Sequence, residues 1–328
     1  MDYANFAGGR TISRLGFGAM GFAGWFGEQP ERASINALVL ALERGITFID
    51  TARAYGASER IVGLALREWT GAKPFLATKI EALGGIEQWG TPVPAEAAFP
   101  PRQVIASCEA SLRALGVEQI DLMQLHTYWP TWGVTGHWME ELQRLKDQGK
   151  IAHIGISVPD HRSDMVLPIV TSGLIDSVQT IVNIFDPTAL EVLVPICAAH
   201  RVAVIARCIL DEGGLTGFLT ADTTFGEGDF RRDYFDGTVP RQAYIDKVEA
   251  LKRFVPAHAS SLAALAIKFV LKDPAITTAI SSMHVPAFAE ANIAAADEAP
   301  LDDATFQRLM TTHRFIKNFN NVKHFGMP

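Results

Sequence analysis

The stretch FIDTARAY, residues 48–55, contains two groups able to exchange protons. Asp50 directly follows a run of apolar residues, and a carboxylate is costly to bury there unless it is paired or used in chemistry. Tyr55 follows five positions later. A phenol has a pKa of about 10 in water, so it serves as an acid or base near neutrality only if its surroundings adjust its hold on the proton. The stretch is therefore a candidate for acid/base chemistry.

Further polar side chains end other short apolar runs of the chain. They are Lys79, His126, Ser157, Asn183 and Arg207. A cation, an anion and an imidazole at one place could hold a substrate oxygen and move a proton. Each also has a structural role open to it, because a strand-end Asp can cap a helix, a Lys can snorkel and a His can be satisfied in a core. Their chemistry depends on whether the fold brings them together.

The apolar runs are rich in Val, Ile, Leu and Phe and lack alternation, as is typical of parallel strands buried on both faces. They cover residues 15–20, 47–51, 75–79, 120–126, 153–157, 177–183, 202–208 and 276–281. Segments with helical spacing lie between them. One begins at Ser58, a suitable N-cap residue, and another ends at Gly116, a suitable residue just beyond a helix.

The alternation of strands and helices continues without a linker-like change in composition, which predicts one α/β domain over residues 1–328. A closed (β/α)8 TIM barrel is favoured over a doubly wound sheet, because GFGAMG at 16–21, which has G-x-G-x-x-G spacing, overlaps the first predicted strand instead of directly following it. Side chains at the C-terminal ends of barrel strands converge on the barrel mouth. The mouth is therefore the predicted location of the site.

Composition excludes several classes of function. The chain has 328 residues, 48% of them hydrophobic and 20% charged, and a formal net charge of −7. Without a long run of Lys and Arg, we expect no nucleic-acid partner. Three dispersed cysteines indicate neither a disulfide framework nor a zinc site, and they fit a reducing cytoplasm. No signal-like N-terminus and no run of 18 apolar residues occurs, so neither secretion nor a membrane span is expected.

The order Asp50, Tyr55, Lys79, His126, each at or just after a predicted strand end, resembles the catalytic tetrad of the aldo-keto reductase superfamily. The resemblance covers nearly the whole chain, through LGFGAMGF, FIDTARAYGASERIVGLAL, LATKI, SLRALGVEQIDLMQLH, LQRLKDQGKIAHIGIS, SVQTIVNIFD, DEGGLTG and PAFAEANIAA. It implies a barrel whose C-terminal tail lies over the mouth. It also implies interconversion of a carbonyl (an aldehyde, ketone or sugar) and its alcohol with a nicotinamide cofactor.

The resemblance assigns a role to each tetrad residue. Tyr55 would protonate the carbonyl oxygen as hydride reaches the carbonyl carbon, or accept the proton in the reverse direction. The charge of Lys79 would lower the pKa of Tyr55, and Asp50 would compensate the buried charge of Lys79. His126 would hydrogen-bond the substrate oxygen, orient it and stabilise developing charge.

The resemblance also implies a set of residues that bind the nucleotide. They are Met20, Asp50, Ser157, Gln179, Arg207, Cys208, Leu210, Gly213, Leu215, Ser282, His284 and Asn292. Ser157 and Gln179 match family residues that bind the carboxamide of the nicotinamide. Val158, however, stands where the family has an Asn.

Arg207 is a second departure, since it takes the place of the aromatic residue that stacks on the nicotinamide in the family. A guanidinium plane can stack on a π system, so Arg207 could still cover the ring. The alternative is a salt bridge to Asp211 or Glu212. The backbone of 210–215 would approach the pyrophosphate, where Gly213 permits close contact.

The adenine end departs most from the family pattern. Relatives usually place a Lys or Arg there to bind the 2′-phosphate of NADP, but this chain has neither between 281 and 292. His284, Ser281 and Ser282 are the remaining hydrogen-bond donors. Family habit favours NADP(H), and the missing cation leaves NAD(H) as the alternative.

Aromatic residues in three loops could wall a substrate pocket, since such pockets are mostly apolar. The predicted pocket residues are Trp25, Phe26, Tyr128 and Trp129. For Trp89 and Trp132, packing within their own loops is an equal alternative. The segment 218–240 is too long for an ordinary connection, and it is predicted to fold over the cofactor.

Two hypotheses stand beside that of a soluble reductase or dehydrogenase acting on a small-molecule carbonyl or alcohol. One is a cofactor-binding regulatory subunit of the same fold with little turnover, which would be expected to carry a partner-binding extension. The other is a metal-dependent hydrolase, which would need an H-x-H or H-E-x-x-H arrangement, and the sequence has neither. We therefore expect no metal. The sequence does not fix the substrate, the direction or the oligomeric state.

Overall fold

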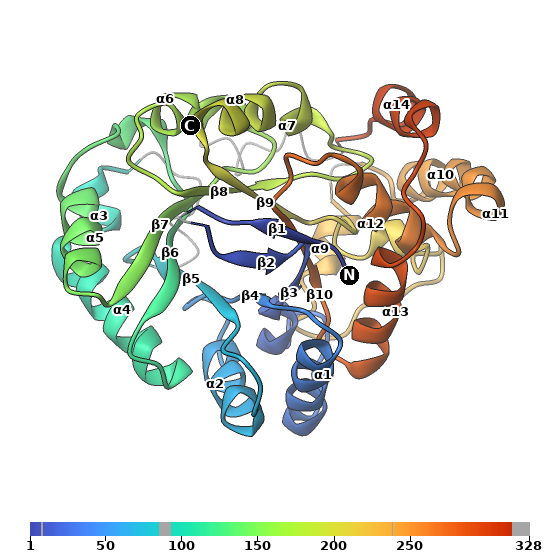
Figure 1. Ribbon diagram of the computed structural model, residues 1–328. Helices are drawn as coiled ribbons and strands as arrows, with labels where there is room; N and C mark the ends of the chain where they lie inside the picture. The colour runs from blue at the N-terminus through green and yellow to red at the C-terminus, as the bar shows by residue number, and fades with distance from the viewer. Residues whose placement is uncertain (8, 85–92, 238, 317–328) are drawn as a thin grey trace.

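The structure, a computed structural model, describes residues 1–7, 9–84, 93–237 and 239–316. Eight parallel strands close into a barrel in the order β10-β3-β4-β5-β6-β7-β8-β9 (Figure 1). The strands are β3 Leu15–Gly18, β4 Phe48–Asp50, β5 Phe75–Glu81, β6 Ile120–His126, β7 Ile151–Ser157, β8 Ser177–Ile181, β9 Ala203–Arg207 and β10 Thr278–Ser282. The predicted (β/α)8 TIM barrel is thereby confirmed.

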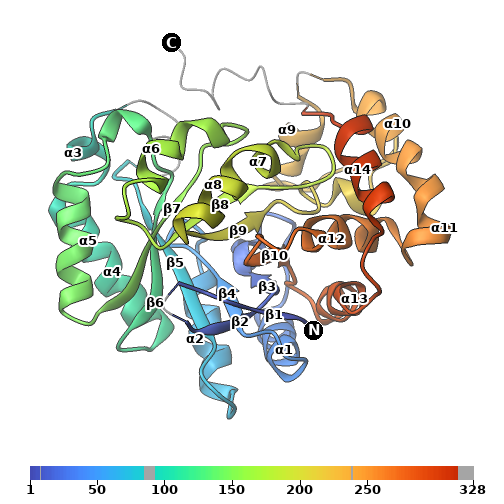
Figure 2. The same cartoon turned by 45° about the horizontal axis from the view of Figure 1, so that its top comes forward.

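Helices surround the barrel, and Figures 1 and 2 both place α10 to α14 together on one side of it. The α-helices are α1 Glu31–Glu43, α2 Ser58–Glu68, α3 Ala95–Ala98, α4 Pro101–Leu115, α5 His137–Asp147, α6 Leu167–Val170, α7 Thr188–Glu191, α8 Leu193–His200, α9 Arg231–Phe235, α10 Arg241–Leu251, α11 Val255–His258, α12 Leu262–Lys272, α13 Pro286–Ala296 and α14 Asp303–Thr312. The 3-10 helices are η1 Ala19–Ala23, η3 Pro130–Trp132, η4 Ser163–Val166, η5 Gly214–Thr216 and η6 Lys252–Phe254.

Each predicted apolar run overlaps one barrel strand, although β5, β7 and β10 extend beyond their runs. All residues of β6 are buried, which explains why its sequence shows no polar alternation. The run 177–183 was predicted too long, because β8 ends at Ile181. The side-chain oxygen of Asn183 accepts hydrogen bonds from the amides of Phe185 and Asp186 and turns the chain. Asn183 therefore stabilises a turn after the strand.

An N-terminal hairpin, which we did not predict, closes one end of the barrel. Strands β1 (Tyr3–Asn5) and β2 (Thr11–Ser13) pair antiparallel, and in Figure 1 they lie across the barrel. Phe6 and Ile12 join a buried cluster with Phe48 and Phe75, which begin β4 and β5. The N-terminal ends of the strands are thus covered, so the opposite end is the one available for a site.

Of the two helix ends predicted from the sequence, one is confirmed and one is wrong. Gly116 takes the left-handed conformation, with φ 70°, and its amide donates to the carbonyl of Leu112, as expected of a residue that ends a helix. Ser58 is not the N-cap of α2, because the helix already includes it. Its hydroxyl instead donates to the carbonyl of Ala19 and lies 2.8 Å from that of Thr51, so it ties η1 to the segment after β4.

No single helix within the described residues is long and apolar enough to cross a membrane. One bent pair, Arg241–His258 with Leu262–Lys272, could do so by length and composition alone. The tail predicted over the barrel mouth falls mostly on 317–328, outside the described residues, and so does Trp89. That residues 1–328 form a single domain remains a prediction.

Gly63 of α2 gives a test of the helix packing around the barrel. A Cβ at this position would lie 2.4 Å from the carbonyl oxygen of Ala114 in α4, so the two helices would have to move apart. We expect Gly63→Ala to destabilise the fold by about 1–3 kcal/mol in urea unfolding. Gly226→Ala is the control, since a Cβ there has no neighbour within 4 Å. Equal stability of the two variants would contradict the close approach of α2 and α4.

Candidate active site

A buried ion pair lies at the centre of the candidate site. Asp50 ends β4 and Lys79 belongs to the neighbouring strand β5. The Lys79 ammonium donates to Oδ2 of Asp50 at 2.5 Å and to the carbonyl oxygen of Thr51 at 2.9 Å. Lys79 is completely inaccessible to solvent and Asp50 nearly so. Burial lowers the pKa of Lys79, and the charge of Asp50 partly opposes that effect.

Two glutamines complete the surroundings of Asp50. The side-chain amide nitrogen of Gln179 in β8 donates to Oδ1 of Asp50 at 2.8 Å, and that of Gln124 in β6 donates at 3.4 Å. Three donors on one carboxylate make a buried charge tolerable. We did not predict Gln124, although a polar residue within the apolar run IDLMQLH was a signal for it.

Tyr55 lies directly above this pair, in the turn between β4 and α2. Its ring centroid is 5.0 Å from the Lys79 ammonium nitrogen. The His126 ring meets it edge-on at 5.5 Å, and the Trp25 ring does so at 5.8 Å. The four residues predicted to be catalytic are therefore gathered at the C-terminal ends of three adjacent strands.

The pKa of Tyr55 differs from the expectation that Lys79 would lower it. Burial raises this pKa well above the ordinary value, and the charge of Asp50 raises it further. The ammonium of Lys79 is directed at Asp50 and the Thr51 carbonyl, while the positive charge that most lowers the pKa of Tyr55 is that of Arg207. The phenol is consequently protonated at neutral pH.

Burial shifts the pKa of His126 in the opposite direction from that of Tyr55. It holds the pKa of His126 well below its ordinary range, and the positive charges of Lys79 and Arg207 act in the same direction. The imidazole is therefore neutral near pH 7. A neutral imidazole can donate one hydrogen bond without carrying a charge of its own.

Arg207 forms neither of the salt bridges considered from the sequence. Its guanidinium forms an ion pair with Asp160, in the loop after β7, and donates to the carbonyl oxygen of Val158 at 3.0 Å. Asp211 instead accepts hydrogen bonds from the hydroxyls of Tyr234 (2.5 Å) and Tyr244 (2.6 Å). Asp160 was not predicted from the sequence.

Cys208 and Glu212 continue this chain of contacts beyond Arg207. The guanidinium lies 3.4 Å from the Cys208 sulfur, and the thiol donates to Oε1 of Glu212 at 3.1 Å. Burial raises the pKa of Glu212 to about 7 and that of Cys208 well above its usual value. Cys208, Asp211 and Glu212 all have left-handed backbone conformations, which are uncommon for these residues and concentrate at functional sites.

The remaining residues predicted for the nicotinamide and pyrophosphate lie on nearby loops. Met20 is half-buried in η1, Ser157 ends β7, and Leu215 is buried in η5. Leu210 and Gly213 belong to the tight turn before η5, where Gly213 takes φ 90°. That conformation suits glycine and lets the backbone of the turn be approached closely.

At the predicted adenine end, His284 is enclosed by other side chains. It is 7% exposed, its ring stacks on Phe26 at 5.7 Å, and its Nδ1 lies 3.0 Å from the Ser282 hydroxyl. Burial lowers its pKa to about 4, so it is neutral at pH 7. Asn292 donates to the Ser281 hydroxyl at 3.0 Å and fastens α13 to β10.

The long segment 218–240, of which residue 238 is not described, reaches across to the loop after β3. Phe230 packs against Phe26 at 5.4 Å and against Trp25 at 6.5 Å. The Arg231 guanidinium donates to the carbonyl oxygen of Phe26 and forms a salt bridge with Asp229. The segment is therefore fastened to the loop that carries two of the predicted pocket aromatics.

The other two predicted pocket residues differ in what they contact. Tyr128 is buried, its hydroxyl donates to the carbonyl of Gly133, and burial raises its pKa to about 12. The indole nitrogen of Trp129 is also buried, but it has no hydrogen-bond partner among the described residues. A buried donor without a partner is costly, so Trp129 is the better candidate for a contact with substrate.

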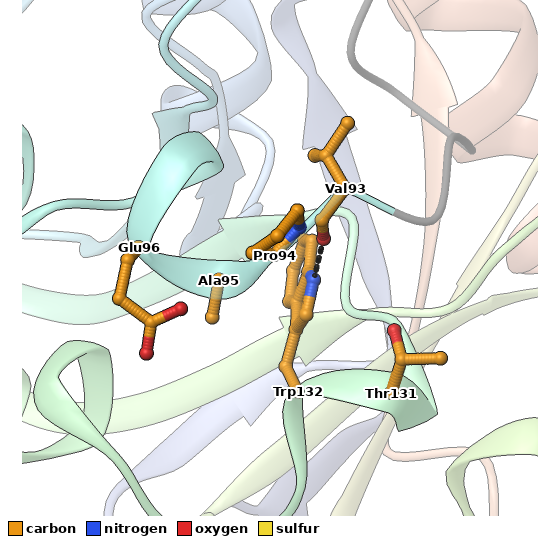
Figure 3. A pocket seen from close by; sticks show the side chains of 6 residues that line it. All are labelled: Val93, Pro94, Ala95, Glu96, Thr131 and Trp132. Carbon is orange, nitrogen blue, oxygen red and sulfur yellow. Dashed lines mark hydrogen bonds between the residues drawn. The ribbon is translucent and has the colours of Figure 1, made fainter.

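Trp132 meets the ring of Tyr128 in its own loop edge-on at 6.2 Å, and it also packs against the segment between β5 and α4. Its indole nitrogen donates to the carbonyl of Val93 (Figure 3). Its ring meets that of Phe99 edge-on at 5.1 Å. It borders a cavity of about 330 Å³ whose lining includes Glu96 and Thr131 (Figure 3). No tetrad residue lines this cavity. Within the described parts of the chain, no cluster of three metal-ligating side chains occurs.

Comparison with known proteins places these observations in a family. The model of the Aldo/keto reductase family matches residues 14–312. The chain is 27% identical over 317 residues to the NADH-specific methylglyoxal reductase of Escherichia coli (strain K12), covering 92% of this chain and 95% of that protein. It is 29% identical over 298 residues to the aldo-keto reductase YhdN of Bacillus subtilis (strain 168), covering 89% and 87%.

A comparison with solved structures points to the same family. The glycerol dehydrogenase AKR11B4 from Gluconobacter oxydans matches with a TM-score of 0.76 and 25% identity, covering 100% of this chain and 97% of that one. The protein is thus a barrel oxidoreductase, and it belongs to the aldo-keto reductase family, whose members use nicotinamide cofactors.

The buried pair predicts strong coupling between Asp50 and Lys79. Asp50→Asn leaves the Lys79 ammonium buried without a counter-charge, so we expect a loss of about 3–5 kcal/mol of unfolding free energy. The double variant Asp50→Asn/Lys79→Met should be less destabilised than the sum of the two single variants, as measured by urea unfolding. Additive losses would contradict a direct interaction between the two charges.

Proposed function

We propose that this protein interconverts a small-molecule carbonyl compound and its alcohol with NAD(P)(H), using Tyr55 as the acid/base. The single observation that best supports the proposal is the gathering of Tyr55, His126 and the Asp50–Lys79 pair at the barrel mouth. This constellation offers a proton and a neutral hydrogen-bond donor at one point, as carbonyl reduction requires.

When bound, the nicotinamide nucleotide supplies or accepts the hydride. In reduction, the Tyr55 hydroxyl gives its proton to the carbonyl oxygen as negative charge develops there; in oxidation, the phenolate takes the proton from the alcohol. His126 donates a hydrogen bond to the same oxygen. The high pKa of Tyr55 suits the reduction direction, because the phenol carries its proton at neutral pH.

The residues around the tetrad fit a nicotinamide nucleotide. The Nε of Arg207 is buried and has no hydrogen-bond partner among the described residues, so a donor at the mouth awaits an acceptor. Gln179 gives its amide nitrogen to Asp50, which leaves its amide oxygen to accept from a carboxamide, and Ser157 ends the adjacent strand. In this proposal Arg207 stands beside the ring, the turn of Cys208, Leu210, Gly213 and Leu215 borders the pyrophosphate, and the segment 218–240 covers it.

The substrate would lie between the loops that follow β3 and β6. Trp25 contacts Tyr55 edge-on, and Trp129 follows His126 by three residues. Its indole nitrogen is a donor for a polar atom of the substrate. The ring of Phe26 packs against His284 and Phe230, so in this proposal Phe26 supports the pocket wall without contacting the substrate.

For the nucleotide, we propose a preference for NAD(H), although family habit favours NADP(H). A 2′-phosphate calls for charge-assisted hydrogen bonds. His284 is neutral and stacked on Phe26, and the nearby cation Arg231 is already paired with Asp229. The similarity to a reductase described as NADH-specific points the same way.

The nucleotide preference can be measured by fluorescence titration of the purified protein. We expect NADH to bind at least about tenfold more tightly than NADPH, a difference of about 1.4 kcal/mol. His284→Gln should leave the ratio of the two affinities unchanged, because neither side chain provides a cation. Tighter binding of NADPH would contradict the proposed preference, and a loss of affinity for NADPH alone in His284→Gln would show that His284 binds the 2′-phosphate.

Tyr55→Phe tests the proton donor. The ring remains in place against His126 and Trp25, so nucleotide affinity should change little, whereas turnover should fall by a factor of about 10²–10⁴. The assay is oxidation of the bound reduced nucleotide with a panel of aldehydes, ketones and sugars. Tyr3→Phe, which removes a phenol hydroxyl at the far end of the barrel, is the matched control. Unchanged turnover in Tyr55→Phe would refute the assignment.

The alternative, a nucleotide-binding regulatory subunit, predicts tight nucleotide binding with negligible turnover of every carbonyl in that panel. The reducing cytoplasm also stays a prediction, based on the use of cysteine in the sequence.

A further inference from the structure

Arg231, the first residue of α9, is a cation that the fold brings close to the predicted adenine end. Its guanidinium carbon lies 5.2 Å from the centroid of the Phe26 ring, and its Nη2 donates to the Phe26 carbonyl oxygen at 3.2 Å. The same ring stacks on His284 at 5.7 Å. Arg231 and His284 therefore share one aromatic neighbour, although the sequence between 281 and 292 contains neither Lys nor Arg.

Aromatic rings keep the Arg231 side chain in this position. Its guanidinium carbon also lies 5.3 Å from the centroid of the Phe218 ring and 5.7 Å from that of the Phe225 ring. A guanidinium that packs on aromatic rings stays charged, and its N–H groups can still donate to acceptors at its edge. By its position and its chemistry, Arg231 is therefore a candidate for binding an anion.

Asp229 compensates the charge of Arg231. Its carboxylate accepts hydrogen bonds from Nε of Arg231 at 2.9 Å, from Nη2 at 2.5 Å and from the Arg231 backbone amide at 3.0 Å. Burial by itself would raise the pKa of Asp229, but the hydrogen bonds from Arg231 outweigh it and hold this pKa below its ordinary value. The carboxylate, in a residue that is 6% exposed, is thus ionised at neutral pH. The pair carries no net charge.

We propose that Asp229 determines the nucleotide specificity of this protein, because it neutralises Arg231 and places a carboxylate where the 2′-phosphate of NADP(H) would need a cation. The phosphate would be repelled by the carboxylate, whereas NAD(H) has an uncharged hydroxyl at that position. The inference rests on the proposed nucleotide site. It goes beyond the neutrality of His284, because it names one side chain whose charge sets the preference.

The test is fluorescence titration of the purified protein with NADPH and NADH. Asp229→Asn keeps an oxygen that can accept from Arg231 but removes the negative charge, so the segment should stay fastened while the cation becomes available. We expect the ratio of NADPH affinity to NADH affinity to rise about tenfold, the size of one charge–charge interaction in a partly solvated site. The gain should shrink at high salt, and the affinity for NADH verifies that the site is intact.

Asp236→Asn is the matched control. It removes one negative charge from the same segment, where Asp236 forms a salt bridge with Arg241, and its affinity ratio should equal that of wild type. The double variant Asp229→Asn/Arg231→Met should lose the gain, because the cation is absent. If Asp229→Asn does not fold, Arg231→Met decides the matter: it leaves the charge of Asp229 uncompensated, so the ratio should move further toward NADH.

An unchanged ratio in Asp229→Asn, or an equal rise in Asp236→Asn, would overturn the proposal. These outcomes are separable from failure of the proposed function. Tighter binding of NADPH by the wild-type protein would refute the proposed preference itself, and binding of neither nucleotide would refute the proposed function. A wild-type protein that prefers NADH, together with an unchanged ratio in Asp229→Asn, refutes only the inference about Asp229.

Discussion

The ion pair between Lys79 and Asp50 is the constraint on which the rest of the site depends. Two charges without access to water are tolerated only if each has a partner. Here the register of adjacent strands places Lys79 against Asp50, the Thr51 carbonyl accepts from Lys79, and two glutamines from β6 and β8 donate to Asp50. The barrel must be closed for β8 to reach Asp50 at all. A functional group and the architecture are therefore stabilised by the same contacts.

Burial acts on Tyr55 and His126, the two side chains above this pair, in complementary ways. It raises the pKa of Tyr55, which keeps the phenol protonated, and lowers that of His126, which keeps the imidazole neutral. One low-dielectric environment thus produces an acid and an uncharged donor side by side. The charge of Arg207 lowers the pKa of Tyr55, and the charges of Lys79 and Arg207 both add to the effect of burial on the pKa of His126.

The loops around the mouth are fastened to one another rather than left open. Asp160 links the loop after β7 to the end of β9, and Arg231 links the long segment after β9 to the loop after β3. The left-handed residues after β9 are held by the two tyrosine hydroxyls on Asp211. Such fastening holds the dipoles and charges around the mouth in fixed positions, which is the preorganisation that the proposed function requires.

The sequence by itself determined the barrel and the gathering of Asp50, Tyr55, Lys79 and His126, because apolar runs ending in polar residues specify both parallel strands and what stands at their ends. It did not determine the partners of those residues. The contacts Arg207–Asp160, Gln124–Asp50 and His284–Phe26 join residues 47 or more positions apart, and only closure of the barrel and the packing of its loops bring them together. Burial likewise depends on the whole fold, so only the tertiary structure decided that the pKa of Tyr55 rises and that His284 offers no cation.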